Sequence, residues 1–290
     1  MKMGFVGSCV LGVAVTTFFA ANNAAVGMIG VDFNHGGATN QSPGSADVVG
    51  PVASAGWNNF INVSSGPLPG TIALADNTNT TTSATLAFKQ GGTALNGYGT
   101  YNSAYGAVGA ANGALDANQQ LFNGAAVSEG FTQEITIKDV PYATFDIYVL
   151  VKAPVGNQGY GNAGYFGESS LQIFNGATAG TTYYFGSSNQ NPIPASGFSY
   201  IKATSTTISS PTLEANYVLF SGLTGGIGSN YSFDLRSPSG AEVGNPFYFN
   251  GNGLLTGVQI VNAESAAVPE PASIALLGSG AMLLLKRRRV

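Results

Sequence analysis

Charged residues are scarce in this chain. Ten Lys or Arg and 14 Asp or Glu make up 8 % of its 290 residues, against about 25 % in an ordinary soluble domain. The net charge of −4 gives no basic footprint, so no nucleic-acid partner is expected. Aromatic residues still account for 11 % of the chain. Because disordered chains are poor in aromatic residues and rich in charge, this composition argues against disorder over the whole length.

Cysteine and histidine are almost absent. Cys9 is the only cysteine, and it lies inside an apolar N-terminal run, so the rest of the chain has no thiol, disulfide or cysteine-based metal site. Lipid attachment at Cys9 is the alternative, although little hydrophobic sequence precedes it. His35 is the only histidine, and any Ser-His-Asp arrangement would need it. Its setting, Asn34-His35-Gly36-Gly37, is typical of an exposed loop. We therefore expect no enzyme activity, catalytic residue, metal or cofactor.

The N-terminus has the pattern of an export signal. Lys2 precedes an apolar run from Phe5 to Ala21, and small residues follow. Ala25 and Gly27 satisfy the small-x-small rule, which predicts a signal peptide over residues 1–27 that forms a helix. An anchor helix that stays in place is the alternative, but its apolar run is short for a span of about 20 residues.

The C-terminal segment, residues 265–290, contains the most specific motif. Two prolines keep Pro269-Glu270-Pro271 extended and accessible. The apolar stretch that follows, residues 272–285, would form a helix of about 21 Å, short of a hydrocarbon core of about 30 Å. A basic cluster then marks the cytoplasmic membrane stop. This cluster consists of Lys286, Arg287, Arg288 and Arg289.

This layout resembles the PEP-CTERM sorting signal of Gram-negative bacteria. The resemblance implies that Pro269, Glu270 and Pro271 are recognised by an exosortase, the expected partner. It also implies a transient anchor in the cytoplasmic membrane, followed by processing and release to the cell surface or beyond. Proteins with this signal usually occur in bacteria that make exopolysaccharide, which is a further expected partner. An ordinary C-terminal tail anchor is the alternative.

The body between the signals, residues 28–264, is expected to be all-β. It has five basic and 13 acidic residues, a net charge of about −8, and no useful helical period. Short apolar or alternating runs are instead separated by Gly, Asn, Ser and Pro. The expected strands are 28–33, 135–138, 145–151, 170–174, 182–185, 198–202, 217–220, 231–235 and 257–261. Many strands without helices predict a single β-sandwich or jelly roll, whose first and last strands we expect to lie close together.

A second resemblance is more diffuse. Five stretches are similar to the exported β-sandwich domains found beside PEP-CTERM tails, which are related to galactose-binding-like and malectin-like jelly rolls. These stretches are residues 31–33, 56–60, 140–149, 216–220 and 256–261. The resemblance implies a fold and carries over no binding residue.

Carbohydrate binding is the main functional hypothesis for the body. Sugars stack on aromatic rings, and their hydroxyls need paired hydrogen bonds. Trp57 with Asn58 supplies one such set, although core packing of Trp57 is the alternative. A loop with Tyr98, Tyr101 and Tyr105 supplies another, and its composition also suits a self-associating surface.

Two further hypotheses remain open. The oxygen-rich stretches 76–79 and 116–118 could bind calcium, or could simply be polar turns. Paired carboxylates such as Glu129 and Glu134 would be needed for a secreted polysaccharide hydrolase, the alternative to a structural or glycan-binding surface protein.

Overall fold

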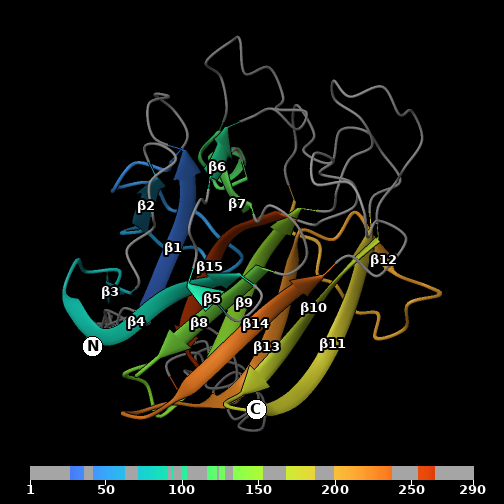
Figure 1. Cartoon of the computed structure of the whole chain (residues 1–290). Coiled ribbons are helices and arrows are strands. Elements are labelled where there is room, and N and C mark those ends of the chain that lie inside the picture. The colour runs from blue at the N-terminus through green and yellow to red at the C-terminus, as the bar shows by residue number, and fades with distance from the viewer. Residues whose placement is uncertain are drawn as a thin grey trace, which may run out of the picture. The chain divides into compact units, whose positions relative to one another are not determined.

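Two β-sheets make up the body of the protein. The computed structural model describes residues 27–35, 42–62, 71–90, 93–94, 99–102, 116–122, 124–127, 133–152, 168–186, 199–236 and 254–264. All of these residues belong to one compact unit, residues 26–267, which we call the body. The described residues form fifteen strands and one short helix (Figure 1).

Sheet 1 has seven strands and runs in the order β13-β9-β15-β1-β2, with β7 beside β15 and β6 beside β7. Its strands are β1 (Met28–His35), β2 (Asn58–Asn62), β6 (Gly99–Asn102), β7 (Gly124–Val127), β9 (Thr144–Lys152), β13 (Tyr217–Thr224) and β15 (Leu254–Asn262). Sheet 2 has eight strands and runs in the order β12-β11-β10-β14-β8-β4-β3, with β5 beside β4. Its strands are β3 (Ile72–Ala75), β4 (Thr81–Gln90), β5 (Thr93–Ala94), β8 (Gln133–Lys138), β10 (Glu168–Asn175), β11 (Thr178–Gly186), β12 (Thr212–Leu213) and β14 (Asn230–Arg236).

The first and last strands of the body are direct neighbours, as the sequence predicts. β1 and β15 pair antiparallel, with Met28 opposite Val261 and Asp32 opposite Gly257 (Figure 1). Just before β1, the carbonyl of Gly27 accepts a hydrogen bond from the amide of Asn262. The described start and end of the body therefore lie together at one end of sheet 1.

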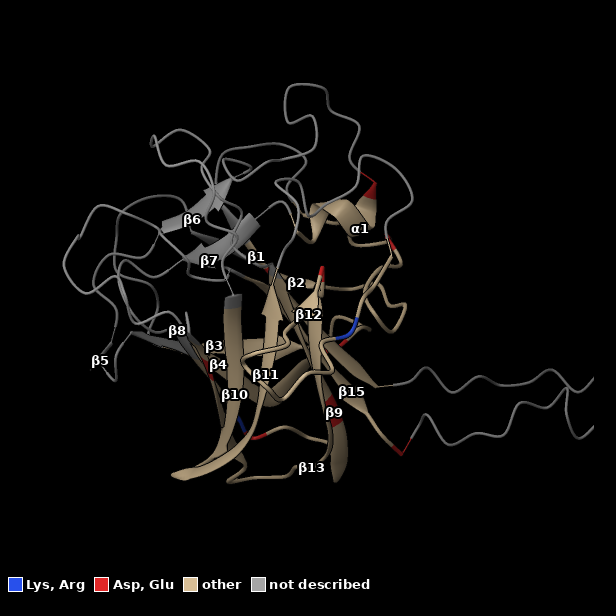
Figure 2. Ribbon diagram, turned by 90° about the vertical axis from the view of Figure 1, so that its right-hand side faces the viewer, with Lys and Arg blue, Asp and Glu red and all other residues tan. Residues whose placement is uncertain are grey.

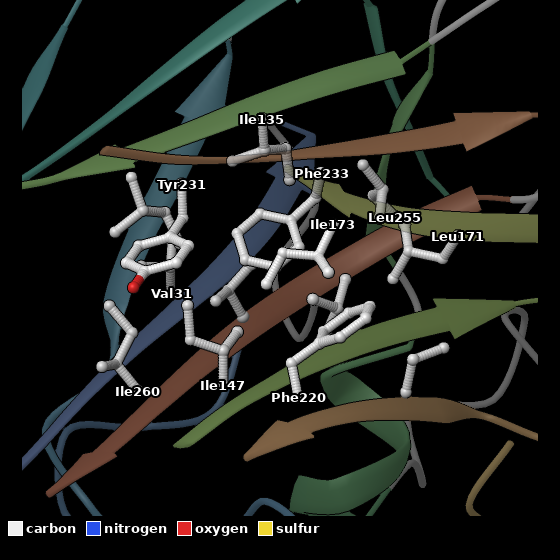
Figure 3. Packing of buried hydrophobic residues seen from close by; sticks show 14 of the residues in the cluster. Val31, Ile135, Ile147, Leu171, Ile173, Phe220, Tyr231, Phe233, Leu255 and Ile260 are labelled. Carbon is white, nitrogen blue, oxygen red and sulfur yellow. The ribbon is translucent and has the colours of Figure 1, made fainter. Parts of the chain in front are cut away.

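The main core lies between the two sheets, because alternate residues of each strand point towards it. Ile29, Val31 and Phe33 of β1 are fully buried there. Rings from opposite sheets meet in this core, and the ring centroids of Phe220 in β13 and Phe233 in β14 are 5.5 Å apart (Figure 3). Since each fully buried side chain of this size contributes about 1.5–3 kcal/mol, such a core stabilises the sandwich through apolar packing.

A second, smaller core covers the other face of sheet 1. Its buried members are Val49, Trp57, Leu121, Phe122 and Leu150. They come from the loop before β2, from the helical turn and from β9. The part of the outer face of sheet 1 around Trp57 and Leu150 is thus buried beneath chain segments.

The only helix in the described residues, α1 (Ala117–Gln120), is a single turn held by a capping box. The Asp116 carboxylate accepts a hydrogen bond from the Gln119 amide, and the Gln119 side chain accepts one from the Asp116 amide. These reciprocal bonds satisfy backbone donors at the start of a helix. They account for a helical turn in an otherwise all-β body.

Most expected strands agree with the structure. Residues 145–151 lie in β9, which is central in sheet 1 as expected, and residues 170–174 and 231–235 lie in β10 and β14. The expected strand at 198–202 is wrong for its described residues, 199–202, where there is only an isolated bridge between Lys202 and Tyr217. The physical reason is that this segment hydrogen-bonds to a side chain: the Ile201 amide donates to the Asn216 side chain, which in turn donates to the Ser199 carbonyl.

Some expectations concern parts of the chain beyond the description. The signal helix over residues 1–27, apart from Gly27, lies outside the described residues, and so do Cys9 and nearly all of the segment 265–290. The jelly-roll topology of the body stays a prediction, whereas two facing sheets with almost no helix agree with the all-β class.

Candidate functional site

Trp57 lies in the second core. Its side chain is 8 % exposed, and its indole nitrogen donates a hydrogen bond to the Ser54 carbonyl at 3.0 Å. The ring lies on the backbone of Gly30 in β1, where an added Cβ would come within 2.6 Å of the ring atom Cδ2. Trp57 therefore packs in a core, which is the alternative interpretation given above for this residue. A sugar could stack on the ring only if the loop that covers it moved away.

Asn58 joins the two sheets at one edge of the sandwich. Its Nδ2 donates to the carbonyls of Gly30 at 2.8 Å and Ala75 at 2.7 Å, and its Oδ1 accepts from the Ala75 amide at 2.9 Å. Gly30 belongs to sheet 1 and Ala75 to sheet 2. The amide group therefore replaces a strand partner for Ala75, and its hydrogen bonds are committed to the fold.

The tyrosine loop is described only in part. Tyr98 and Tyr105 lie outside the described residues, while the backbone of Tyr101 belongs to β6 and pairs with Ala125 of β7. The side chain of Tyr101, like Tyr98 and Tyr105, lies outside the description, so three of the five carbohydrate-binding candidates stay a prediction. The two whose side chains are described, Trp57 and Asn58, serve the core and the sheet edge.

The first calcium candidate forms a polar turn. One carboxylate oxygen of Asp76, Oδ1, accepts hydrogen bonds from the amide and hydroxyl of Thr78 and from the amide of Thr80. Partial burial raises the pKa of this carboxyl, but the three hydrogen bonds together outweigh it, so the pKa is lowered from its usual value. Asn77 accepts from the Met28 amide and donates its own amide to the Met28 carbonyl. The segment thus has a structural role as a turn that ties β1 to sheet 2.

The second calcium candidate is also engaged in the fold. Asp116 caps α1, and the Asn118 side chain accepts hydrogen bonds from the Gly50 amide and the Tyr200 hydroxyl. Burial is the largest effect on Tyr200 and raises the pKa of its hydroxyl far above the usual range. Within the described residues, no group of three or more His, Cys, Asp or Glu side chains is placed to hold a metal ion.

Polar groups beneath the covering loop were not identified from the sequence. Gln259 of β15 is fully buried on the outer face of sheet 1, where its amide group exchanges two hydrogen bonds with the backbone of Val52. Asp32 of β1 is also fully buried. Burial raises the pKa of Asp32 well above its usual range, and the nearby Ser42 side chain lowers it by a smaller amount. Alternation with Val31 and Phe33 predicts that Asp32 faces away from the main core, but not that this second face is covered.

His35 ends β1, and its backbone pairs with Asn62 of β2. Its side chain lies outside the description, as does Glu129. In the described part of the chain, no helix has the length and apolar character that crossing a membrane requires.

Comparison with known proteins bears on the C-terminal segment, whose Pro269, Glu270, Pro271 and terminal basic cluster lie outside the described residues. A search of curated proteins gives no match to the chain. Residues 267–289 match the family model described as the PEP-CTERM protein-sorting motif. The chain therefore carries at its C-terminal end the sorting signal of a protein that is exported, anchored at a membrane before processing, and sorted by an exosortase.

Proposed function

We propose that this protein is a non-catalytic component of the cell surface or extracellular matrix of a Gram-negative bacterium, with a structural or glycan-binding role. The observation that carries the proposal is the PEP-CTERM motif at residues 267–289, which follows an all-β body. Charged residues are few along the strands of this body (Figure 2). The body is stabilised by apolar packing and amide hydrogen bonds. Its fold therefore does not depend on a reducing compartment, which suits a location outside the cell.

The sorting half of the proposal is tested by replacing the acidic residue of the motif. In a host with an exosortase, Glu270→Ala should leave the protein unprocessed and retained in the membrane fraction. Glu264→Ala is the matched control, because Glu264 is an exposed acid that lies before the matched segment. Fractionation and immunoblotting report the result. Equal processing of E270A and E264A would contradict recognition of Pro-Glu-Pro.

The glycan-binding half has its own test. Exopolysaccharide from the producing strain is immobilised, and retention of the protein is measured together with release of reducing sugar. Binding without turnover is the expected result. Tyr101→Ala should weaken retention, whereas Tyr184→Ala, a half-buried tyrosine of sheet 2, should leave it unchanged. If exopolysaccharide is not retained, the structural role alone stands.

A secreted polysaccharide hydrolase is the alternative proposal, and one register observation favours it. Asp234 of β14 lies directly opposite Glu134 of β8, and both positions alternate with core residues. Opposite positions have Cβ atoms about 4.5–5.5 Å apart, which suits the carboxyl spacing of about 5–5.5 Å in retaining glycosidases. Lys89 of β4 lies opposite Glu134 on the other side, so a row of positions with alternating charge explains the same residues without catalysis. Reducing-sugar release that Asp234→Asn abolishes would favour the hydrolase.

A further inference from the structure

Asp32 is a fully buried carboxylate with the Ser42 side chain nearby. Its side chain is 0 % exposed, and neither carboxylate oxygen has a hydrogen-bond partner within the described residues. It sits in β1 between Val31 and Phe33, which both point into the main core. Asp32 therefore points to the outer face of sheet 1, beneath the second core.

On the β15 side of Asp32, no side chain compensates its charge. Its opposite residue in β15 is Gly257, and the next position in that row of sheet 1 is Leu150. A Cβ added to Gly257 would lie 2.6 Å from the Val31 carbonyl oxygen and 3.2 Å from the Leu150 Cδ1 atom. The backbone is therefore closely packed on this side of Asp32, and the next side chain in the row is apolar. On the other side, Asn59 of β2 lies opposite Asp32.

A second unpartnered oxygen occurs at the same place. Thr256 precedes Gly257 and lies at the bulge where the register of β15 against β9 shifts. Its side chain is fully buried, and its hydroxyl has no hydrogen-bond partner in the described part of the chain. The strand paired with β15 also changes here: β15 pairs with β1 up to Gly257 and with β7 at Leu255. We call this place the β1–β15 fork, consisting of Asp32, Thr256 and Gly257.

The fork has the chemistry of a site for a hard cation. An isolated ionised carboxylate in an apolar environment is costly, and buried charges in proteins are normally paired or bound to metal. Protonation is the alternative way to remove the charge, and its O–H donor would then need an acceptor such as the Ser42 side chain. A cation removes the charge and uses carboxylate and hydroxyl oxygens together.

We propose that the β1–β15 fork binds one hard cation through the Asp32 carboxylate and the Thr256 hydroxyl, with Ca²⁺ as the first candidate. Oxygen ligands are those that Ca²⁺ prefers, and sites in extracellular modules bind it with Kd values of about 10⁻⁴–10⁻³ M. Because the fork has a single carboxylate, we expect it to bind Ca²⁺ with a Kd in this weak range. The site is distinct from the two polar turns considered for calcium, and it does not depend on the proposed glycan binding.

The test uses the full chain in detergent micelles, treated with chelator and dialysed. Equilibrium dialysis measures bound Ca²⁺, and thermal unfolding is followed by the fluorescence of Trp57, the only tryptophan. We expect one Ca²⁺ per chain at saturation. At a Ca²⁺ concentration of ten times Kd, the ratio of folded to unfolded protein should rise about elevenfold.

Asp32→Asn should abolish both binding and stabilisation, and Thr256→Val should weaken them. Glu264→Gln removes an exposed carboxylate and should behave as the wild type. If D32N does not fold, the wild-type stoichiometry and T256V decide the question. Saturable binding of Mg²⁺, Na⁺ or K⁺ that T256V weakens would support the site and identify its ion. No bound cation in the wild type, or equal stabilisation of wild type and D32N, would overturn the proposal.

Discussion

Removing the Asn58 side chain should separate the two sheets at one edge of the sandwich. The side chain makes three hydrogen bonds of 2.7–2.9 Å, to the carbonyl of Gly30 and to both backbone groups of Ala75. In Asn58→Ala these three half-buried backbone groups lose their partner. At about 0.5–1.5 kcal/mol for each bond, and with partial rehydration, unfolding should become easier by about 2–3 kcal/mol. This corresponds to a change of roughly 30- to 150-fold in the unfolding equilibrium.

Urea unfolding followed by the fluorescence of Trp57 measures this change, because the only tryptophan is buried next to Asn58 in sequence. Asn59→Ala is the matched control, since the Asn59 side chain is exposed, and it should change stability by less than about 0.5 kcal/mol. The slope of the free energy against urea should be the same in both variants. A stability of N58A equal to that of N59A would refute the role of Asn58 as a link between the sheets.

Three further predictions concern the outer face of sheet 1 and the start of the body. Gly30→Ala places a Cβ 2.6 Å from the ring of Trp57 and should destabilise the protein by about 1–3 kcal/mol, less so in a Trp57→Phe background, as a double-mutant cycle by urea unfolding can test. Gln259→Leu removes both hydrogen bonds to Val52 and should lower the free energy of unfolding by about 1–3 kcal/mol, measured as a lower urea midpoint. An unchanged midpoint would contradict a stabilising role of these two bonds. Burial and the charge of Asp76 raise the pKa of Tyr142 to about 12, above its unfolded value of about 10, so this stabilisation is complete below pH 10 and is lost as the pH rises towards 12. Tyr142→Phe removes a buried hydroxyl without a partner, so it should leave stability at pH 7 intact and lessen the alkaline loss in a pH series of thermal melts.

The sequence predicts strands well where their burial has a simple cause. β9 reads as a continuous apolar run because Phe145, Ile147 and Val149 enter the main core while Leu150 enters the second core. β4 was missed although Ala84 and Leu86 alternate with polar residues, so its signal was present. The pairing of β1 with β15 followed from the expectation that the ends of a sandwich meet, and the register confirms it.

The second core could not be predicted, because it depends on contacts between residues far apart in the chain. Gln259 hydrogen-bonds to Val52, which is 207 residues away in the chain, and no local sequence pattern predicts this contact. Asp32 illustrates the consequence. Its alternation with Val31 and Phe33 correctly predicts that it faces away from the main core. In most sandwiches that face is open to solvent, but here Asp32 is buried. The sorting motif, by contrast, is a local pattern, and the sequence alone was sufficient to identify it.

The neighbouring positions of β1 and β15 determine how the body would respond to mechanical tension. A pull between Gly27 and Asn262 would open the β1–β15 ladder from one end, so that the hydrogen bonds break one after another. A pull on the C-terminal segment alone, with the opposite end of the body held, would act along β15, which is flanked by β1 on one side and β9 on the other. In that geometry the two ladders resist together by shear. Removal of an N-terminal tether would therefore convert the attachment from one that unzips to one that withstands tension.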